Sequence, residues 1–62
     1  MKTDKDKDIA RAAIFLLSQH GENALHVAEK RAEHLADAGQ FYAAEIWFEI
    51  VAEIRATLRH AA

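Results

Sequence analysis

Apolar and polar residues alternate at helical spacing along three stretches of the chain, and two glycines, Gly21 and Gly39, separate these stretches. Apolar side chains that recur every three or four residues lie on one face of a helix. Each glycine stands where a residue with left-handed backbone geometry commonly ends a helix. The pattern therefore predicts helices at about residues 4–20, 22–38 and 40–60.

The short connections at the two glycines favour helices that lie antiparallel to their neighbours in sequence. We therefore expect a single all-α domain over residues 1–62, arranged as a three-helix antiparallel bundle or extended helical hairpin. The charged segment 1–8 is expected to be partly frayed. The second helix has one polar face and one alanine-rich face. The small side chains of the alanine-rich face let a neighbouring helix approach closely. This face comprises Ala24, Leu25, Ala28, Ala32, Leu35 and Ala36.

The first and third helices carry more bulky apolar side chains than a three-helix core needs. In the first helix, Ile14 and Phe15 project to either side of Arg11 and Ser18. The third helix has an apolar arc of about half its circumference, formed by Ala43, Ala44, Ile46, Trp47, Phe48, Ile50, Val51, Ile54 and Leu58. An exposed apolar patch of this kind attracts a partner.

We predict that this surplus forms a contact made by the first and third helices. Tryptophan is a favoured interface anchor, and a closed two-fold pair is the commonest assembly of identical chains. The alternative is that the same side chains simply fill the core of an irregular bundle. The predicted interface residues are Ile14, Phe15, Ile46, Trp47, Ile50 and Ile54.

Composition narrows the classes of function. The 62 residues are 52% apolar with a net charge of −2, and they include no cysteine, so a disulfide framework, a thiolate metal site and a cysteine nucleophile are excluded. The apolar run 12–17 is too short to cross a bilayer, and the first residues lack the apolar core of a signal peptide, so we expect a cytoplasmic protein that does not bind membranes. The positively charged residues are scattered along the sequence, which disfavours nucleic-acid binding. The residues that would contact a nucleic acid are Lys30, Arg55 and Arg59.

An acidic stripe on the third helix is the main polar feature. Glu45, Glu49 and Glu53 are spaced four residues apart, and like charges at this spacing repel. Cations such as Arg11, Lys30 or Arg31, or a bound metal, would offset the repulsion. We interpret this feature as a solvated stripe without a cofactor. The alternative is a small metal-binding helical protein that uses these three carboxylates together with His26.

Enzyme activity is not expected. Ser18, Thr3 and Thr57 lie far apart on the predicted helices, so none of them gains the neighbouring base that a nucleophile requires. The sequence also has no glycine-rich loop for phosphate groups. We therefore predict a non-catalytic protein–protein interaction module that forms a homodimer or binds another protein.

Residues 28–61 resemble a single tetratricopeptide hairpin, through Ala32, Leu35, Gly39, Ala44, Phe48 and Val51. The closing proline of that repeat is missing, and a second copy is absent, whereas solenoids need about three repeats. The resemblance implies the packing of a helical hairpin and not a peptide-binding superhelix.

Residues 10–58 also resemble a family of short, uncharacterised alphaproteobacterial proteins, a domain of unknown function. The shared features are His20-Gly21-Glu22, Arg31-Ala32, Gly39 and Trp47. This resemblance implies three helices and a bacterial cytoplasmic setting, and it implies no activity.

Overall fold

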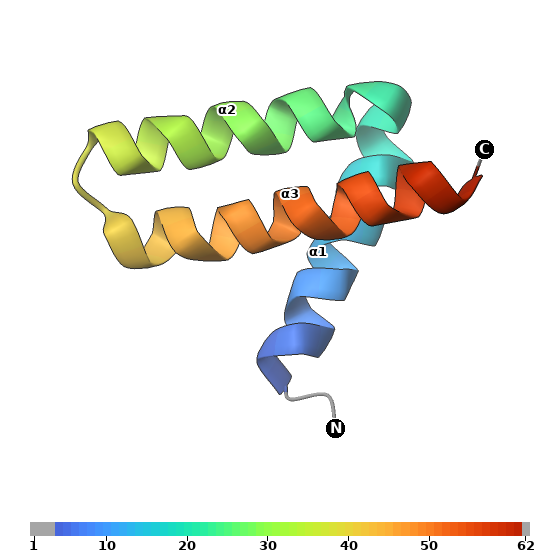
Figure 1. The fold of residues 1–62 in the computed structure, drawn as a ribbon, viewed down its shortest axis with the longest axis horizontal. Helices are drawn as coiled ribbons and strands as arrows, with labels where there is room; N and C mark the ends of the chain where they lie inside the picture. Colours follow the sequence, from blue (N-terminus) through green and yellow to red (C-terminus); the bar gives the residue numbers. More distant parts are fainter. Residues whose placement is uncertain (1–3, 62) are drawn as a thin grey trace.

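The computed structural model describes residues 4–61, and every regular element in this range is helical (Figure 1). Helix α1 spans Asp4–His20, the short 3₁₀ helix η1 spans Gly21–Asn23, α2 spans Ala24–Asp37 and α3 spans Phe41–Ala61. The predicted all-α class is confirmed. Asp4 and Asp6 lie in the first turn of α1, while Arg59 and His60 lie in the last turn of α3, so both sets of charges complement the helix dipoles.

The helix ends differ slightly from those expected. The first helix coincides with the expected 4–20, the second begins at Ala24 because η1 occupies the three residues before it, and the third begins at Phe41. Residues 4–8 of the segment that was expected to fray are helical, and residues 1–3 lie outside the described range.

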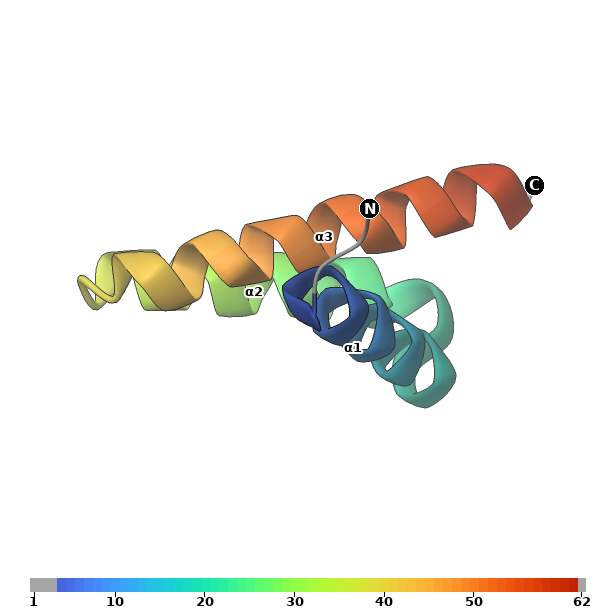
Figure 2. The same cartoon turned by 90° about the horizontal axis from the view of Figure 1, so that it is seen from below.

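The arrangement of the helices departs from the expected antiparallel bundle. Helices α2 and α3 lie antiparallel and form a hairpin, whereas α1 crosses α3 (Figures 1 and 2). Gly21 has a positive φ of 58°, and η1 continues directly into α2, so α1 and α2 form one bent helical segment. Because the chain keeps winding through η1, it changes direction at this point without folding back on itself.

A turn of defined geometry joins α2 to α3. Gly39 has a φ of 80°, and its N–H donates to the carbonyl oxygen of Ala36 at 3.0 Å. The N–H of Gln40 donates to the carbonyl oxygen of Leu35 at 2.9 Å. These two hydrogen bonds form a Schellman motif, which satisfies carbonyl groups at the end of α2 and reverses the chain. The carbonyl oxygen of Gln40 then accepts the first hydrogen bond of α3, from Ala44.

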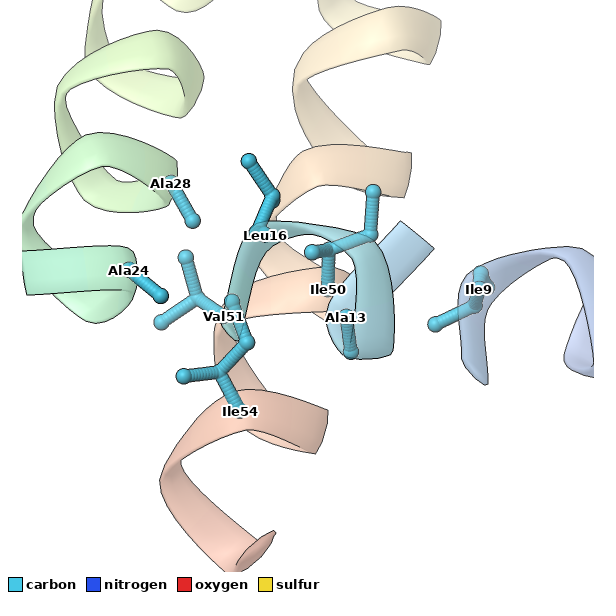
Figure 3. Close-up of a cluster of buried hydrophobic side chains, with 8 residues drawn as sticks. All are labelled: Ile9, Ala13, Leu16, Ala24, Ala28, Ile50, Val51 and Ile54. Atoms are coloured by element: carbon cyan, nitrogen blue, oxygen red, sulfur yellow. The ribbon is translucent and has the colours of Figure 1, made fainter. Parts of the chain in front are cut away.

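The main apolar core lies where the three helices meet (Figure 3). Helix α2 contributes only alanines to it, and these small side chains let α3 pack closely against α2. Helix α1 lies over the same part of α3 and closes the cluster. The buried members are Ile9, Ala13, Leu16, Ala24, Ala28, Ile50, Val51 and Ile54.

Within residues 4–61, buried polar side chains are absent. None of the helices in this range has the length and apolar character needed to cross a membrane.

Candidate interaction surface

The outer face of α1 carries two large apolar side chains that are open to solvent. Ile14 is 66% exposed and Phe15 is 62% exposed. They follow one another in sequence on the side of the helix away from Ile9, Ala13 and Leu16, which face the core. Arg11 and Ser18 are also exposed on this outer side, as expected from the helical spacing.

Two of the predicted interface residues belong to the intramolecular core, and the expectation that they would stay uncovered is wrong. Ile50 is 4% exposed and Ile54 is 0% exposed. Figure 3 shows both among side chains of α1 and α2. The physical reason is the crossing of α1 over α3, which places Ile9, Ala13 and Leu16 in the same cluster as these isoleucines.

Ile46 and Trp47 are partly buried and pack against the core cluster. The guanidinium group of Arg31, on α2, lies over the Trp47 ring. Because Arg31 of α2 covers one face of the indole ring, Trp47 contributes to the packing of α2 against α3 within one subunit. Of the six predicted interface residues, Ile14 and Phe15 are therefore the ones that stand open to solvent.

Helix α3 exposes three aromatic residues that the sequence analysis did not assign to a contact. Phe41 and Tyr42 are each 72% exposed, and Phe48 is 50% exposed. Phe48 was expected in the apolar arc of the third helix, but the arc is wider than the strip covered by α1 and α2. The sequence contains one sign that Phe41 and Phe48 are exposed. They are seven residues apart and share a helix face with Glu45, a residue type that is usually found in solvent.

In the described part of the chain, grooves lie on both sides of α3. One, of about 450 Å³, runs between α2 and α3 and is lined by His26, Glu29, Lys30, Glu33, Phe48, Val51, Ala52 and Arg55. Another, of about 420 Å³, runs between α1 and α3 and is lined by Lys5, Asp8, Ile9, Ala12, Tyr42, Ile46 and Ile50. Both grooves are lined by apolar and charged side chains. In the first groove, Arg55 and Glu29 form an ion pair at 3.2 Å that joins α3 to α2.

The acidic stripe of α3 is compensated by a lysine that the sequence analysis did not name. The ammonium group of Lys5, in α1, lies 3.3 Å from the carboxylate of Glu49. The hydrogen bond and the negative charge of Glu49 raise the pKa of Lys5 above its ordinary value of 10.5. Arg11, Lys30 and Arg31, which were the expected partners, lie elsewhere: Arg11 is on the exposed side of α1 and Arg31 is over Trp47.

The candidate metal ligands do not assemble into a site. In the described part of the chain, no three side chains among His, Asp and Glu are grouped closely enough to hold a metal ion. His26 lines the groove between α2 and α3, whereas Glu49 is paired with Lys5. The alternative function as a metal-binding protein therefore gains no support from the arrangement of Glu45, Glu49, Glu53 and His26.

The candidate cations for nucleic-acid binding are also dispersed. Arg55 is held by Glu29, and Lys30 lines the same groove. Arg59 lies in the last turn of α3. A nucleic-acid backbone is recognised by a concentration of free positive charge, and the pairing of Arg55 with a carboxylate works against that.

Comparison with known proteins adds no relative: no family model, curated protein or solved structure matches the chain. The two family resemblances inferred from the sequence remain predictions.

Proposed function

We propose that this protein is a small, non-catalytic helical interaction module that pairs with a second copy of itself. The observation that carries the proposal is the exposure of Ile14 and Phe15 side by side on the outer face of α1. Adjacent large apolar side chains on an otherwise polar helix face typically mark a protein contact, and an aromatic anchor supplies much of the binding energy in such contacts.

The composition of the core supports self-association. A small core buries little apolar surface, so the folding free energy that it supplies is close to marginal. Several core positions are alanines, which bury little apolar area each. Covering Ile14 and Phe15 in a dimer would add apolar burial that the single subunit lacks.

The remaining expectations from the sequence belong to the same proposal. They are a bacterial cytoplasmic setting, and α1 and α3 as the helices that face the partner. The participation of α3 is supported by the exposure of Phe48.

Sedimentation equilibrium over roughly micromolar to millimolar concentration tests the proposal. The wild-type chain is expected to shift from monomer to dimer across this range, and the double variant Ile14→Ser, Phe15→Ser is expected to remain monomeric. Phe41→Ser is a matched control, because it removes a similarly exposed aromatic ring from the far end of α3. A wild-type chain that stays monomeric at the highest concentration contradicts the proposal.

A further inference from the structure

We propose that the contact between two copies is α1 packed antiparallel against α1 of the partner, about a two-fold axis that passes between Ile14 and Phe15. This inference rests on the proposed self-association. It narrows the contact from α1 and α3 to α1 and gives its direction and register. The evidence is the position of four exposed residues on α1 and the distribution of charge along that helix.

The outer face of α1 has a clear midline. At 100° per residue, Arg11 and Ser18 lie within roughly 20° of each other around the helix axis. Ile14 and Phe15 stand roughly 50° to either side of that line. All four side chains are exposed. The face therefore consists of a polar midline flanked on one side by isoleucine and on the other by phenylalanine.

A two-fold axis makes this face complementary to itself. An axis perpendicular to both helices reverses the direction of the chain and keeps each flank on its own side. Phe15 then meets the partner's Phe15 on one flank, and Ile14 meets the partner's Ile14 on the other. Along the midline Arg11 comes opposite the partner's Ser18, whose small side chain leaves room for the long guanidinium group.

The charges along α1 favour the antiparallel direction. The charged residues of α1 all lie at positions 4–11, and residues 12–19 carry none. In the register given above, residues of α1 whose numbers add up to 29 come level, so Arg11 faces the partner's Ser18 and not another charged side chain. A parallel pair in register would instead place Arg11 against the partner's Arg11 and Lys7 against the partner's Lys7, and such like-charge contacts are unfavourable.

The position of α1 in the fold leaves this face accessible. Ile9, Ala13 and Leu16 face the core from the opposite side of the helix, so α3 does not cover the outer face. Two helices of 17 residues bury less surface than the interfaces of permanent dimers. The pair is therefore expected to be weak and to populate only at high protein concentration.

Engineered cysteines give a direct test, because the natural chain contains none. Arg11→Cys and Ser18→Cys are prepared separately, one of them labelled with ¹⁵N, then mixed at high concentration and oxidised mildly. Mass spectrometry then separates the mixed disulfide dimer from each self-linked dimer. The expected result is a clear excess of the mixed dimer, because positions 11 and 18 come level.

Self-linked dimers are expected to be rare in the proposed register. Two copies of the same cysteine would lie about seven residues apart along the helices, roughly 10 Å, which is beyond the reach of a disulfide. Thr57→Cys, exposed on α3, gives the background rate of random collision.

The outcomes separate this inference from the proposed function. Self-linked dimers of Arg11→Cys and of Ser18→Cys in excess of the mixed dimer would indicate a parallel pair and overturn the register. Self-association of the wild-type chain together with background cross-linking at both positions would place the contact elsewhere, and would overturn the inference while the proposed function stands. A wild-type chain that stays monomeric in the sedimentation experiment would contradict both the proposed function and this inference.

Discussion

The guanidinium carbon of Arg31 lies 5.5 Å from the centroid of the Trp47 ring, so a cation–π contact joins α2 to α3. The indole is partly buried against the core, and the arginine, itself exposed, covers part of it. Trp47 thereby contributes to the stability of the hairpin within a single subunit. This assignment differs from the interface anchor that its residue type suggested.

Arg31→Met tests this contact, because methionine retains an unbranched apolar chain and removes the charge. The free energy of unfolding is expected to fall by about 0.5–1 kcal/mol, the usual size of a cation–π contact near a surface. Urea unfolding followed by circular dichroism measures it, and the emission of Trp47 should shift as its surroundings change. Lys30→Met is the control, since Lys30 is exposed on the same helix. An equal loss in both variants would show that the aromatic contact contributes nothing.

Ile54→Ala and Ile14→Ala form a matched pair that separates core from surface. Among the described residues, Ile54 is the largest fully buried side chain, so its truncation is expected to cost about 2–5 kcal/mol and to unfold much of the population. Ile14→Ala removes the same atoms from an exposed site and should change the stability of the monomer by about 0.5 kcal/mol or less. Urea unfolding at low protein concentration measures both. Similar losses at the two positions would contradict the assignment of Ile54 to the core.

The helices themselves were predictable because their signals are local. Residues at helical spacing, Gly21 and Gly39 each act within one or two turns of the chain, and the structure ends α1 and α2 close to these glycines. The three-residue helix η1 was not predictable in the same way. Whether the chain folds back or only bends after Gly21 depends on how α1 packs on α3, which is a property of the whole molecule.

The candidate surface was predictable only in part, for the same reason. Ile14 and Phe15 lie on the side of α1 away from its core stripe, and the local spacing was enough to place them outside. On α3, Ile54 and Phe48 both belong to one wide apolar arc. The crossing of α1 decides which of them is covered, and the sequence contains no local signal for that crossing.

Ala28→Leu probes the close approach of α2 and α3. Ala28 is fully buried in the core, where a larger side chain must displace its neighbours. The free energy of unfolding is expected to fall by about 1–3 kcal/mol, the usual cost of overpacking. Ala52→Leu makes the same change at an exposed position of α3 and should be nearly neutral. Thermal unfolding of both variants measures the contrast, and a neutral Ala28→Leu would indicate a looser core than the structure has.

Glu49→Gln tests the ion pair with Lys5 through its pH dependence. The pKa of Lys5 is raised in the folded state by its hydrogen bond to Glu49 and by the charge of that carboxylate. A raised pKa means that the pair stabilises the fold fully below the ordinary lysine value of 10.5 and loses this effect as the pH rises through the folded-state pKa. Both side chains are exposed, so the effect is small and weakens with added salt.

The measurement is the difference in urea midpoint between wild type and Glu49→Gln. This difference is expected to favour the wild type at neutral pH in low salt and to shrink both in high salt and above pH 10.5. Glu33→Gln, on the exposed face of α2, serves as the control for removing one negative charge. A difference that stays constant up to strongly alkaline pH would show that the ammonium group of Lys5 is not its source.

Gly39→Ala tests whether the turn between α2 and α3 depends on left-handed backbone geometry. The φ of 80° at Gly39 disfavours any side chain, although an added Cβ would meet no atom within 4 Å. The cost is therefore conformational and not steric crowding by neighbours, and it is expected to be about 1–2 kcal/mol in the free energy of unfolding. Gly39→Asn should cost less, because asparagine adopts this geometry more readily than alanine. Urea unfolding of the three proteins gives the order glycine, asparagine, alanine from most to least stable. If the alanine variant equalled the wild type, the hydrogen bonds that close the turn would have to form with a negative φ at residue 39, and the Schellman motif would not be what ends α2.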